Sequence, residues 1–204
     1  MVKVKICGIT SRDDALIACD AGADALGFNF VAEARKRNRY ITPDDAETII
    51  RQLPPFVTSV AVVANETPER LQEYLEFVDC LQLHGDEPPE IYASFSHRVI
   101  KAVRITEDFQ PETLQRHPAS AYLVDSYVPH ALGGSGVSCD WQKAREIASM
   151  YRYVILAGGL TPENVQQAIH IVQPYGVDTA SGVESAPGKK DPEKMRRFIR
   201  AAKA

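Results

Sequence analysis

The sequence predicts an α/β protein built as a single (β/α)8 barrel. Short apolar runs alternate with helical segments along the chain, and most runs are continuously apolar, as expected of parallel strands buried on both faces. Eight such runs in 204 residues fit a small barrel of this class. The predicted strands span residues 2–7, 24–28, 56–63, 79–83, 98–103, 121–125, 153–156 and 176–178. An open doubly wound sheet is the alternative, but the turn after the first strand lacks the G-x-G-x-x-G pattern of that fold.

Capping residues mark the helix starts between these strands. Ser11 precedes two acids of a first helical turn, which is a favourable N-terminal arrangement. Thr42, Thr67 and Thr161 each precede a proline at the first helical position, and Asp191 opens the last helix in the same way. We therefore expect regular helices at these places.

The segment after the fifth strand, residues 108–118, shows little apolar periodicity, so we predict a weak or irregular fifth helix. No linker, charge run or low-complexity stretch divides the chain. We therefore expect one catalytic domain over residues 1–204.

Composition narrows the possible partners. The chain is 45% hydrophobic and 25% charged, with a formal net charge of −4, which argues against a nucleic-acid or membrane-surface partner. The four cysteines form no C-x-x-C pair, so the sequence carries no zinc or thioredoxin-like motif. Without a recognisable signal peptide or membrane-length apolar run, we expect a cytoplasmic protein with free thiols.

Polar side chains stand at the carboxyl ends of several predicted strands, which form the active-site face of a barrel. Cys7, His84, Asp125 and Asp178 hold such positions. Cys7, His84 and Asp125 each have a structural alternative: a buried thiol, a hydrogen-bonded strand-end histidine and a loop-capping aspartate. Lys5 shares a strand face with Cys7, and because a buried lysine needs a counter-charge, we predict that it pairs with Asp178. A purely structural ion pair is the simpler interpretation of Lys5.

Glycine clusters follow the last three strands, at residues 133–136, at Gly158 and Gly159, and at Ser181 and Gly182. The last two occupy the loops where barrels commonly bind phosphate, because glycine lets backbone N–H groups approach an anion closely. Each cluster alone is also compatible with a simple turn. The chain has no Walker-type lysine motif, so we predict a small phosphate ester as the ligand.

Seven blocks, in order and spacing, carry a family resemblance. They are KICGIT at 5–10, GADALGF at 22–28, QLHG at 82–85, GGSG at 133–136, LAGGL at 156–160, the segment from Val177-Asp178 to Glu184, and PGKKD at 187–191. Together they resemble phosphoribosylanthranilate isomerase from end to end. The resemblance implies a (β/α)8 barrel that converts N-(5-phosphoribosyl)anthranilate, a phosphosugar, into an aminoketose by an Amadori rearrangement in tryptophan synthesis, without a cofactor or metal.

The resemblance also implies roles for individual residues. Asp125 is expected to act as general acid, protonating the ribose ring oxygen to open a Schiff base. Cys7 is expected to act as general base, taking the proton from C2′. One acid and one base in the same site require two groups whose environments move their pKa values apart.

The matching positions further imply a substrate-binding set. Arg39 matches the arginine that holds the anthranilate carboxylate, but the loop at 31–38 is longer than usual, which leaves Arg35 and Arg37 as alternatives. The other expected substrate contacts are His84, Gly134, Ser135, Gly136 and Asp178, and the expected phosphate contacts are Gly158, Gly159, Ser181 and Gly182.

Two other functions remain open from the sequence. One is the related barrel isomerase of histidine synthesis, or a bifunctional enzyme that accepts both substrates; the former carries aspartate at the end of its first strand, where this chain has Cys7. The other is a non-catalytic phosphosugar-binding barrel, which would need neither Cys7 nor Asp125. A monomer and a homodimer are equally compatible with the sequence.

Overall fold

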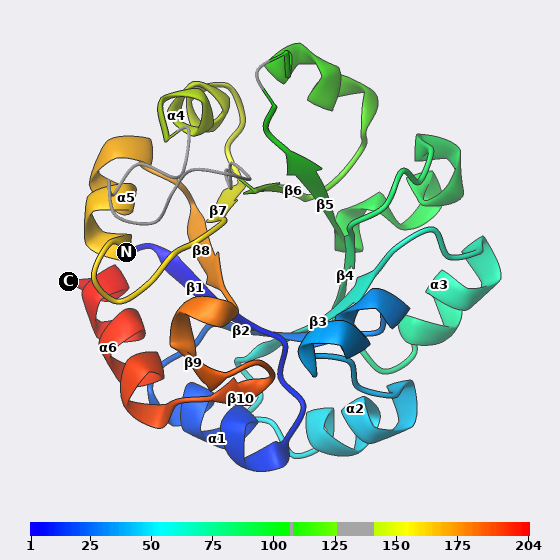
Figure 1. The fold of residues 1–204 in the computed structure, drawn as a ribbon. Helices are drawn as coiled ribbons and strands as arrows, with labels where there is room; N and C mark the ends of the chain where they lie inside the picture. The colour runs from blue at the N-terminus through cyan, green and yellow to red at the C-terminus, as the bar shows by residue number, and fades with distance from the viewer. Residues whose placement is uncertain (107, 126–140) are drawn as a thin grey trace.

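A computed structural model describes residues 1–106, 108–125 and 141–204, and it contains a closed barrel of eight parallel strands surrounded by helices (Figure 1). The predicted fold class is confirmed. Every predicted strand is present, with ends shifted by at most two residues. The barrel strands are β1 (Lys3–Cys7), β2 (Ala25–Asn29), β3 (Thr58–Val63), β4 (Cys80–Leu83), β5 (Val99–Arg104), β6 (Ala121–Asp125), β7 (Val154–Ala157) and β8 (Gly176–Thr179).

Strand register places the predicted site residues beside one another. Consecutive strands pair in order, and β8 closes the barrel against β1. In that closing pair Lys5 is opposite Asp178, and on the other side of β1 Cys7 is opposite Gly27. The carboxyl end of β1 is therefore flanked by the ends of β2 and β8.

Among the described residues, the outer layer contains six α-helices: α1 (Arg12–Asp20), α2 (Pro43–Ile50), α3 (Pro68–Tyr74), α4 (Trp141–Met150), α5 (Val165–Val172) and α6 (Pro192–Lys203). Four predicted caps are confirmed. The side chains of Ser11, Thr42, Thr67 and Asp191 each accept a hydrogen bond from a backbone N–H of the first turn.

The helix predicted to start at Thr161 begins later, at Val165, so that expectation is wrong. The Asn164 side chain accepts from the Thr161 N–H at 2.8 Å and donates to the Gly159 carbonyl at 3.0 Å. These bonds hold a turn between the strand and the helix. Two glycines at positive φ, Gly158 and Gly159, precede that turn, so the chain is not yet helical there.

Short 3₁₀ segments replace α-helices after β4 and β5. The weak fifth helix is confirmed as η4 (Pro111–Arg116), whereas η2 (Pro89–Ile91) and η3 (Ala93–Arg98) after β4 were not predicted. Pro88 and Pro89 remove two backbone donors at the start of that segment, and Phe95 interrupts η3 with non-helical angles. The barrel wall is consequently covered less regularly on this side.

Two apolar layers make the core. The larger lies between the strands and the outer elements. The smaller fills the barrel and consists of Val60, Ile100, Ala102, Ala121, Leu123, Ile155 and Ala157. Because Lys5, Gln82 and Asp178 are also buried, the interior carries charged and amide groups beside this apolar cluster.

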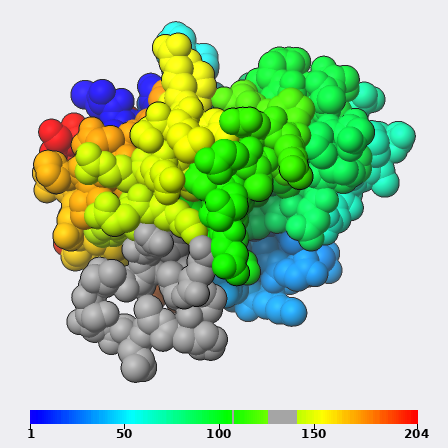
Figure 2. Space-filling model, turned by 90° about the horizontal axis from the view of Figure 1, so that it is seen from above, coloured from blue at the N-terminus to red at the C-terminus, as the bar shows by residue number. Residues whose placement is uncertain are grey.

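Three further elements lie near the barrel mouth: η1 (Ala32–Arg37), η5 (Ser181–Val183) and a hairpin of β9 (Glu184–Ala186) and β10 (Lys189–Lys190). The hairpin lies beside α1 and the end of β1 in Figure 1. In Figure 2, where the molecule is turned by 90° from the view of Figure 1, the N-terminal residues, in dark blue, lie at the upper left. Within the described residues, no helix is long and apolar enough to cross a membrane.

Candidate active site

Cys7, Lys5 and Asp178 form a buried cluster at the end of β1. The Lys5 ammonium donates to Asp178 Oδ1 at 3.0 Å, and the two side chains are 4% and 9% exposed, so the predicted ion pair is confirmed. Burial opposes the charged form of Lys5, but Asp178 and Cys7 outweigh it and raise the pKa of Lys5. Lys5 is therefore a cation at neutral pH, placed beside a sulfur.

Gly27 makes this arrangement sterically possible. A Cβ atom at position 27 would lie 2.8 Å from Cys7 Sγ and 2.9 Å from Lys5 Nζ. A Cβ carbon does not approach other heavy atoms that closely, so any larger residue would displace the thiol or the ammonium. Gly27 belongs to the block 22–28 that carries the family resemblance, but its steric role was not predicted.

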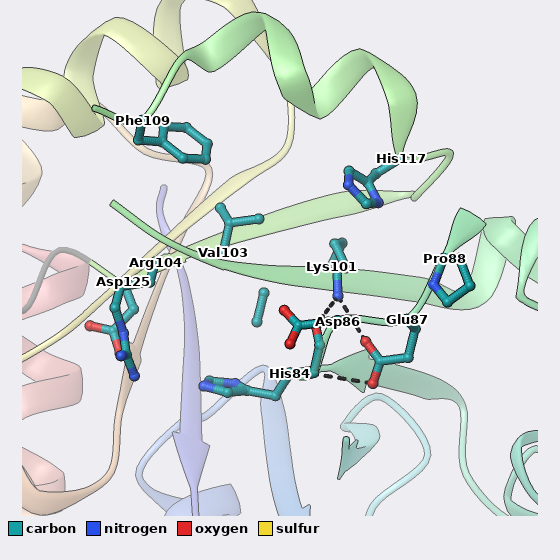
Figure 3. Close-up of a pocket in the computed structure, with 12 residues that line it drawn as sticks. His84, Asp86, Glu87, Pro88, Lys101, Val103, Arg104, Phe109, His117 and Asp125 are labelled. Carbon is teal, nitrogen blue, oxygen red and sulfur yellow. Dashed lines mark hydrogen bonds and ion pairs between the residues drawn. The ribbon is translucent and has the colours of Figure 1, made fainter. Parts of the chain in front are cut away.

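His84 and Asp125 line one cavity at the ends of β4, β5 and β6 (Figure 3). The cavity has a volume of about 580 Å³ and also contacts Arg104, Phe109 and His117. Figure 3 shows His84, Arg104 and Asp125 on one side and Lys101, Glu87 and His117 on the other. Cys7 and Arg39 lie outside the lining of this cavity, although Cys7 stands at the same end of the barrel.

His84 is positioned by Gln82, whose amide nitrogen lies 3.3 Å from His84 Nδ1. With Gln82 as donor, the ring proton is on Nε2. Burial lowers the pKa of His84, and Lys5 and Arg104 act in the same direction, against the opposing effect of Asp125 and Asp178. His84 is thus a neutral imidazole at neutral pH, available as a hydrogen-bond donor.

A second buried ion pair lies on the outer side of β5. Lys101 lies between Ile100 and Ala102 of the inner cluster, so its side chain points away from the barrel interior. Its ammonium donates to Glu87 Oε2 at 2.8 Å and to the Gly85 carbonyl at 2.5 Å. Glu87 also accepts from the N–H groups of Asn65 and Gly85, at 2.7 and 3.2 Å. This pair fixes the loop that follows β4.

The three candidate arginines have different surroundings. The guanidinium of Arg35 lies 4.2 Å above the Tyr40 ring, and Arg37 is exposed. Arg39 instead runs along Gly8, where its Cδ lies 3.2 Å from the position of a Gly8 Cβ. Arg39 is the one of the three that reaches the residue next to Cys7, which supports its assignment to the site.

Arg39 is held by Glu184 through two hydrogen bonds, Nε to Oε1 at 2.9 Å and Nη2 to Oε2 at 2.7 Å. Lys190, whose side chain is fully buried, donates to Glu184 Oε1 and to the Ala180 carbonyl, each at 3.0 Å. Burial alone would raise the pKa of Glu184, but Arg39 and Lys190 lower it. Glu184 is therefore a carboxylate at neutral pH.

The glycine loops after β7 and β8 are packed against each other. Thr179 Oγ1 donates to the Leu160 carbonyl at 2.8 Å, and a Cβ on Gly182 would overlap that same carbonyl oxygen. Gly158 and Gly159 both have positive φ. The structure thus brings the two predicted phosphate loops together, at the end of the barrel where Cys7 lies. The remaining predicted contacts, Gly134, Ser135 and Gly136, lie outside the described residues.

Sequence reasoning assigned no role to Glu184, Lys190, Lys101 or Glu87. A lysine inside the apolar strand run 98–103 was a readable sign of a buried ion pair at Lys101. Glu184 stood in a family block, but its contact with Arg39 joins positions 145 residues apart, which no sequence pattern indicates.

Comparison with known proteins gives a consistent result. The family model described as N-(5'phosphoribosyl)anthranilate (PRA) isomerase matches residues 4–201. The N-(5'-phosphoribosyl)anthranilate isomerase of Pelobacter propionicus is 48% identical over 205 residues, which cover 100% of this chain and 96% of that protein.

Two solved structures are also similar. A phosphoribosyl anthranilate isomerase in complex with reduced 1-(o-carboxyphenylamino)-1-deoxyribulose 5-phosphate has a TM-score of 0.86 and 41% identity, covering 100% of this chain and 99% of the other. Monomers of the dimeric enzyme from Thermotoga maritima give a TM-score of 0.85 and 39% identity, with the same coverage.

Proposed function

Because the chain belongs to the N-(5'-phosphoribosyl)anthranilate isomerase family, we propose that Cys7 and Asp125 are the base and acid of its reaction. The protein is a phosphoribosylanthranilate isomerase of tryptophan biosynthesis. The observation that carries the assignment of the base is the placement of the Lys5 ammonium, itself held by Asp178, beside the Cys7 sulfur. Asp125 ends β6 and lines the cavity with His84, which supports its role as the acid.

In the first step, Asp125 donates its proton to the ring oxygen of the ribose. The C1′–O bond breaks, and the lone pair of the anthranilate nitrogen forms a protonated Schiff base with C1′. Neutral His84 supplies a hydrogen-bond donor on the same cavity wall, suited to a substrate hydroxyl or the released oxygen. The group that opens the ring therefore works beside an uncharged donor.

In the second step, the Cys7 thiolate takes the proton from C2′, and the C–H electron pair moves to the Schiff base to give an enolamine. Tautomerisation of the enolamine gives the aminoketose. Lys5 is the counter-ion for the thiolate, and Asp178 keeps Lys5 in place. The two ends of the substrate are assigned to different residues. Arg39 is assigned to the anthranilate carboxylate, and the loops with Gly158, Gly159, Ser181 and Gly182 to the phosphate, with Gly134, Ser135 and Gly136 as further contacts.

A fluorescence assay tests the reaction. The purified protein should consume N-(5-phosphoribosyl)anthranilate, seen as loss of the substrate's fluorescence, and should show no turnover with the aminoaldose substrate of histidine synthesis in a parallel assay. Turnover of both substrates would instead identify a bifunctional enzyme. Binding of product analogues without turnover of either substrate would identify a phosphosugar-binding barrel.

We also propose a homodimer formed through the amino-terminal end of the barrel. Phe56 is 96% exposed there and borders a cavity lined by apolar side chains such as Val60, Ile100 and Ile155. A large exposed apolar side chain next to an apolar cavity favours association of two copies. The dimeric relative from Thermotoga maritima supports the same assembly state.

Sedimentation velocity checks this proposal. The unmodified protein should sediment as a dimer and Phe56→Glu as a monomer, because a carboxylate cannot be buried unpaired in an apolar cavity. Ala32→Glu, an exposed position on η1 at the other end of the barrel, is the matched control and should remain dimeric. A monomeric unmodified protein, or a dimeric Phe56→Glu, would contradict the proposal.

A cytoplasmic location and a single catalytic domain over residues 1–204 complete the proposed function. Free thiols at Cys7, Cys19 and Cys80 support a reducing compartment. The family model extends over nearly the whole chain, which supports the single domain.

A further inference from the structure

The guanidinium of Arg39 meets Glu184 through one particular edge. A guanidinium presents five N–H donors in a rigid plane, and carboxylates pair with it two donors at a time. Glu184 takes Nε and one hydrogen of Nη2. The outer edge, formed by Nη1 and the other hydrogen of Nη2, has the same bidentate geometry and is not part of this pair. A second carboxylate can therefore bind to the outer edge of the same guanidinium.

The cluster formed by Arg39, Lys190 and Glu184 contains more positively than negatively charged side chains. Arg39 and Lys190 are cations that share one carboxylate, Glu184, whose side chain is 5% exposed. Burial lowers the pKa of Lys190, against the opposing effect of Glu184 and Cys7. With Lys190 protonated, the group of Arg39, Lys190 and Glu184 carries an excess of one positive charge. One more carboxylate brings it to neutrality, which is favourable where water is largely excluded.

Backbone contacts also hold the segments that carry Arg39 and Glu184. A Cβ on Gly188, in the β9–β10 turn, would overlap the carbonyl oxygen of Asn38, so the hairpin is in close contact with the residue before Arg39. Lys194 of α6 donates to the Glu184 carbonyl at 2.8 Å. The β9–β10 hairpin thus contacts the loop that carries Arg39, and Glu184 is held through both its backbone and its side chain.

We propose that Glu184 is a positioning residue for substrate recognition: held by Lys190, it fixes Arg39 so that the outer edge of the guanidinium receives the carboxylate of the anthranilate ring. This inference rests on the proposed function of Arg39. Glu184 does not touch the substrate. Glu184 sets the orientation of Arg39. Lys190 offsets the negative charge of Glu184, so that Arg39 keeps an attraction for a second carboxylate.

Two ligands separate recognition of the carboxylate from the rest of binding. One is the reduced product analogue 1-(o-carboxyphenylamino)-1-deoxyribitol 5-phosphate, and the other is the same molecule with a phenyl ring that lacks the carboxylate. The ratio of their dissociation constants, measured by calorimetry, reports the contribution of the carboxylate alone. In the unmodified protein the carboxylate should tighten binding, and Arg39→Ala should lose that gain and raise KM.

Glu184→Asp is the decisive variant, because it keeps the charge of the cluster but shortens the side chain by one methylene. We expect the gain from the carboxylate to fall by about tenfold or more, with the affinity of the ligand without the carboxylate changed less than about twofold. KM should rise while kcat changes little. Lys189→Met, an exposed lysine next to Lys190 on the same hairpin, is the matched control and should behave as the unmodified protein.

Glu184→Gln provides a second test, also if Glu184→Asp fails to fold in a circular-dichroism melt. It adds a net positive charge to the cluster, so if charge alone governed recognition the carboxylate ligand would bind more tightly, whereas a positioning role predicts weaker binding. An unchanged ratio of affinities in either variant, or equal losses for both ligands, would overturn the inference. No turnover by the unmodified protein would instead refute the assigned reaction, independently of these binding ratios.

Discussion

Cys7→Ser and Asp125→Asn are each expected to lower kcat by on the order of 10²-fold or more, the usual contribution of a general acid or base. A serine hydroxyl does not ionise near neutral pH, so it cannot accept the C2′ proton as a thiolate does. An asparagine amide has no proton to give to the ring oxygen. Both substitutions preserve size, and KM should change much less than kcat because neither group is assigned to ground-state binding.

Matched controls separate these effects from general damage. Cys19→Ser on α1 and Asp20→Asn at the end of that helix make the same chemical changes away from the site, and both should retain normal turnover. A substrate deuterated at C2′ should show a larger isotope effect in Cys7→Ser than in the unmodified enzyme, because proton abstraction becomes slower. Near-normal kcat in either site variant would remove that residue from the mechanism.

Glu87→Gln is expected to lower the free energy of unfolding by about 3–5 kcal/mol at pH 7, the usual cost of leaving one buried charge without its partner. Glu87 and Lys101 are 2% and 4% exposed, and Lys101 would keep only the Gly85 carbonyl among the acceptors described above. Urea unfolding at pH 7 measures this loss. Glu73→Gln breaks an exposed pair with Arg70 and should cost no more than about 1 kcal/mol.

The stability lost in Glu87→Gln should be greater at neutral pH than in acid. Burial alone would raise the pKa of Glu87, but Lys101 and the backbone N–H of Asn65 lower it below the ordinary value of 4.5. A lowered folded-state pKa contributes stability above the unfolded-state value, and that stability disappears as the pH falls through the folded-state pKa. The two proteins should therefore differ most at neutral pH and converge in acid. A difference that stays constant down to pH 3 would contradict this account.

The sequence predicted the barrel because strands buried on both faces are continuously apolar, and such runs are readable without tertiary information. The Lys5–Asp178 pair was also predictable, since side-chain alternation and barrel closure bring the first and last strands together. The Lys101–Glu87 pair was not predicted, because Glu87 lies in an irregular loop, where no periodicity indicates the direction of a side chain.

Other features depended on contacts that no local pattern encodes. The helix start at Thr161 failed because the Asn164 side chain stabilises a turn with the backbone of Gly159 and Thr161, a choice between two locally reasonable structures. The partner of Arg39 was unpredictable for a different reason. Glu184 meets it only when the hairpin after β8 reaches the loop after β2, which requires the finished barrel.

Three of the links between the beginning and the end of the chain have a consequence for folding. Pairing of β1 with β8, the Lys5–Asp178 pair and the Arg39–Glu184 pair all join segments at least 145 residues apart. Contacts of such high sequence separation form late, because the entropy of closing a long loop opposes them until the intervening structure exists. A chain emerging from the ribosome holds Cys7 and Arg39 from the outset but cannot orient either one until its last quarter has been synthesised. Incomplete chains are therefore inactive, and activity arises only when the barrel closes.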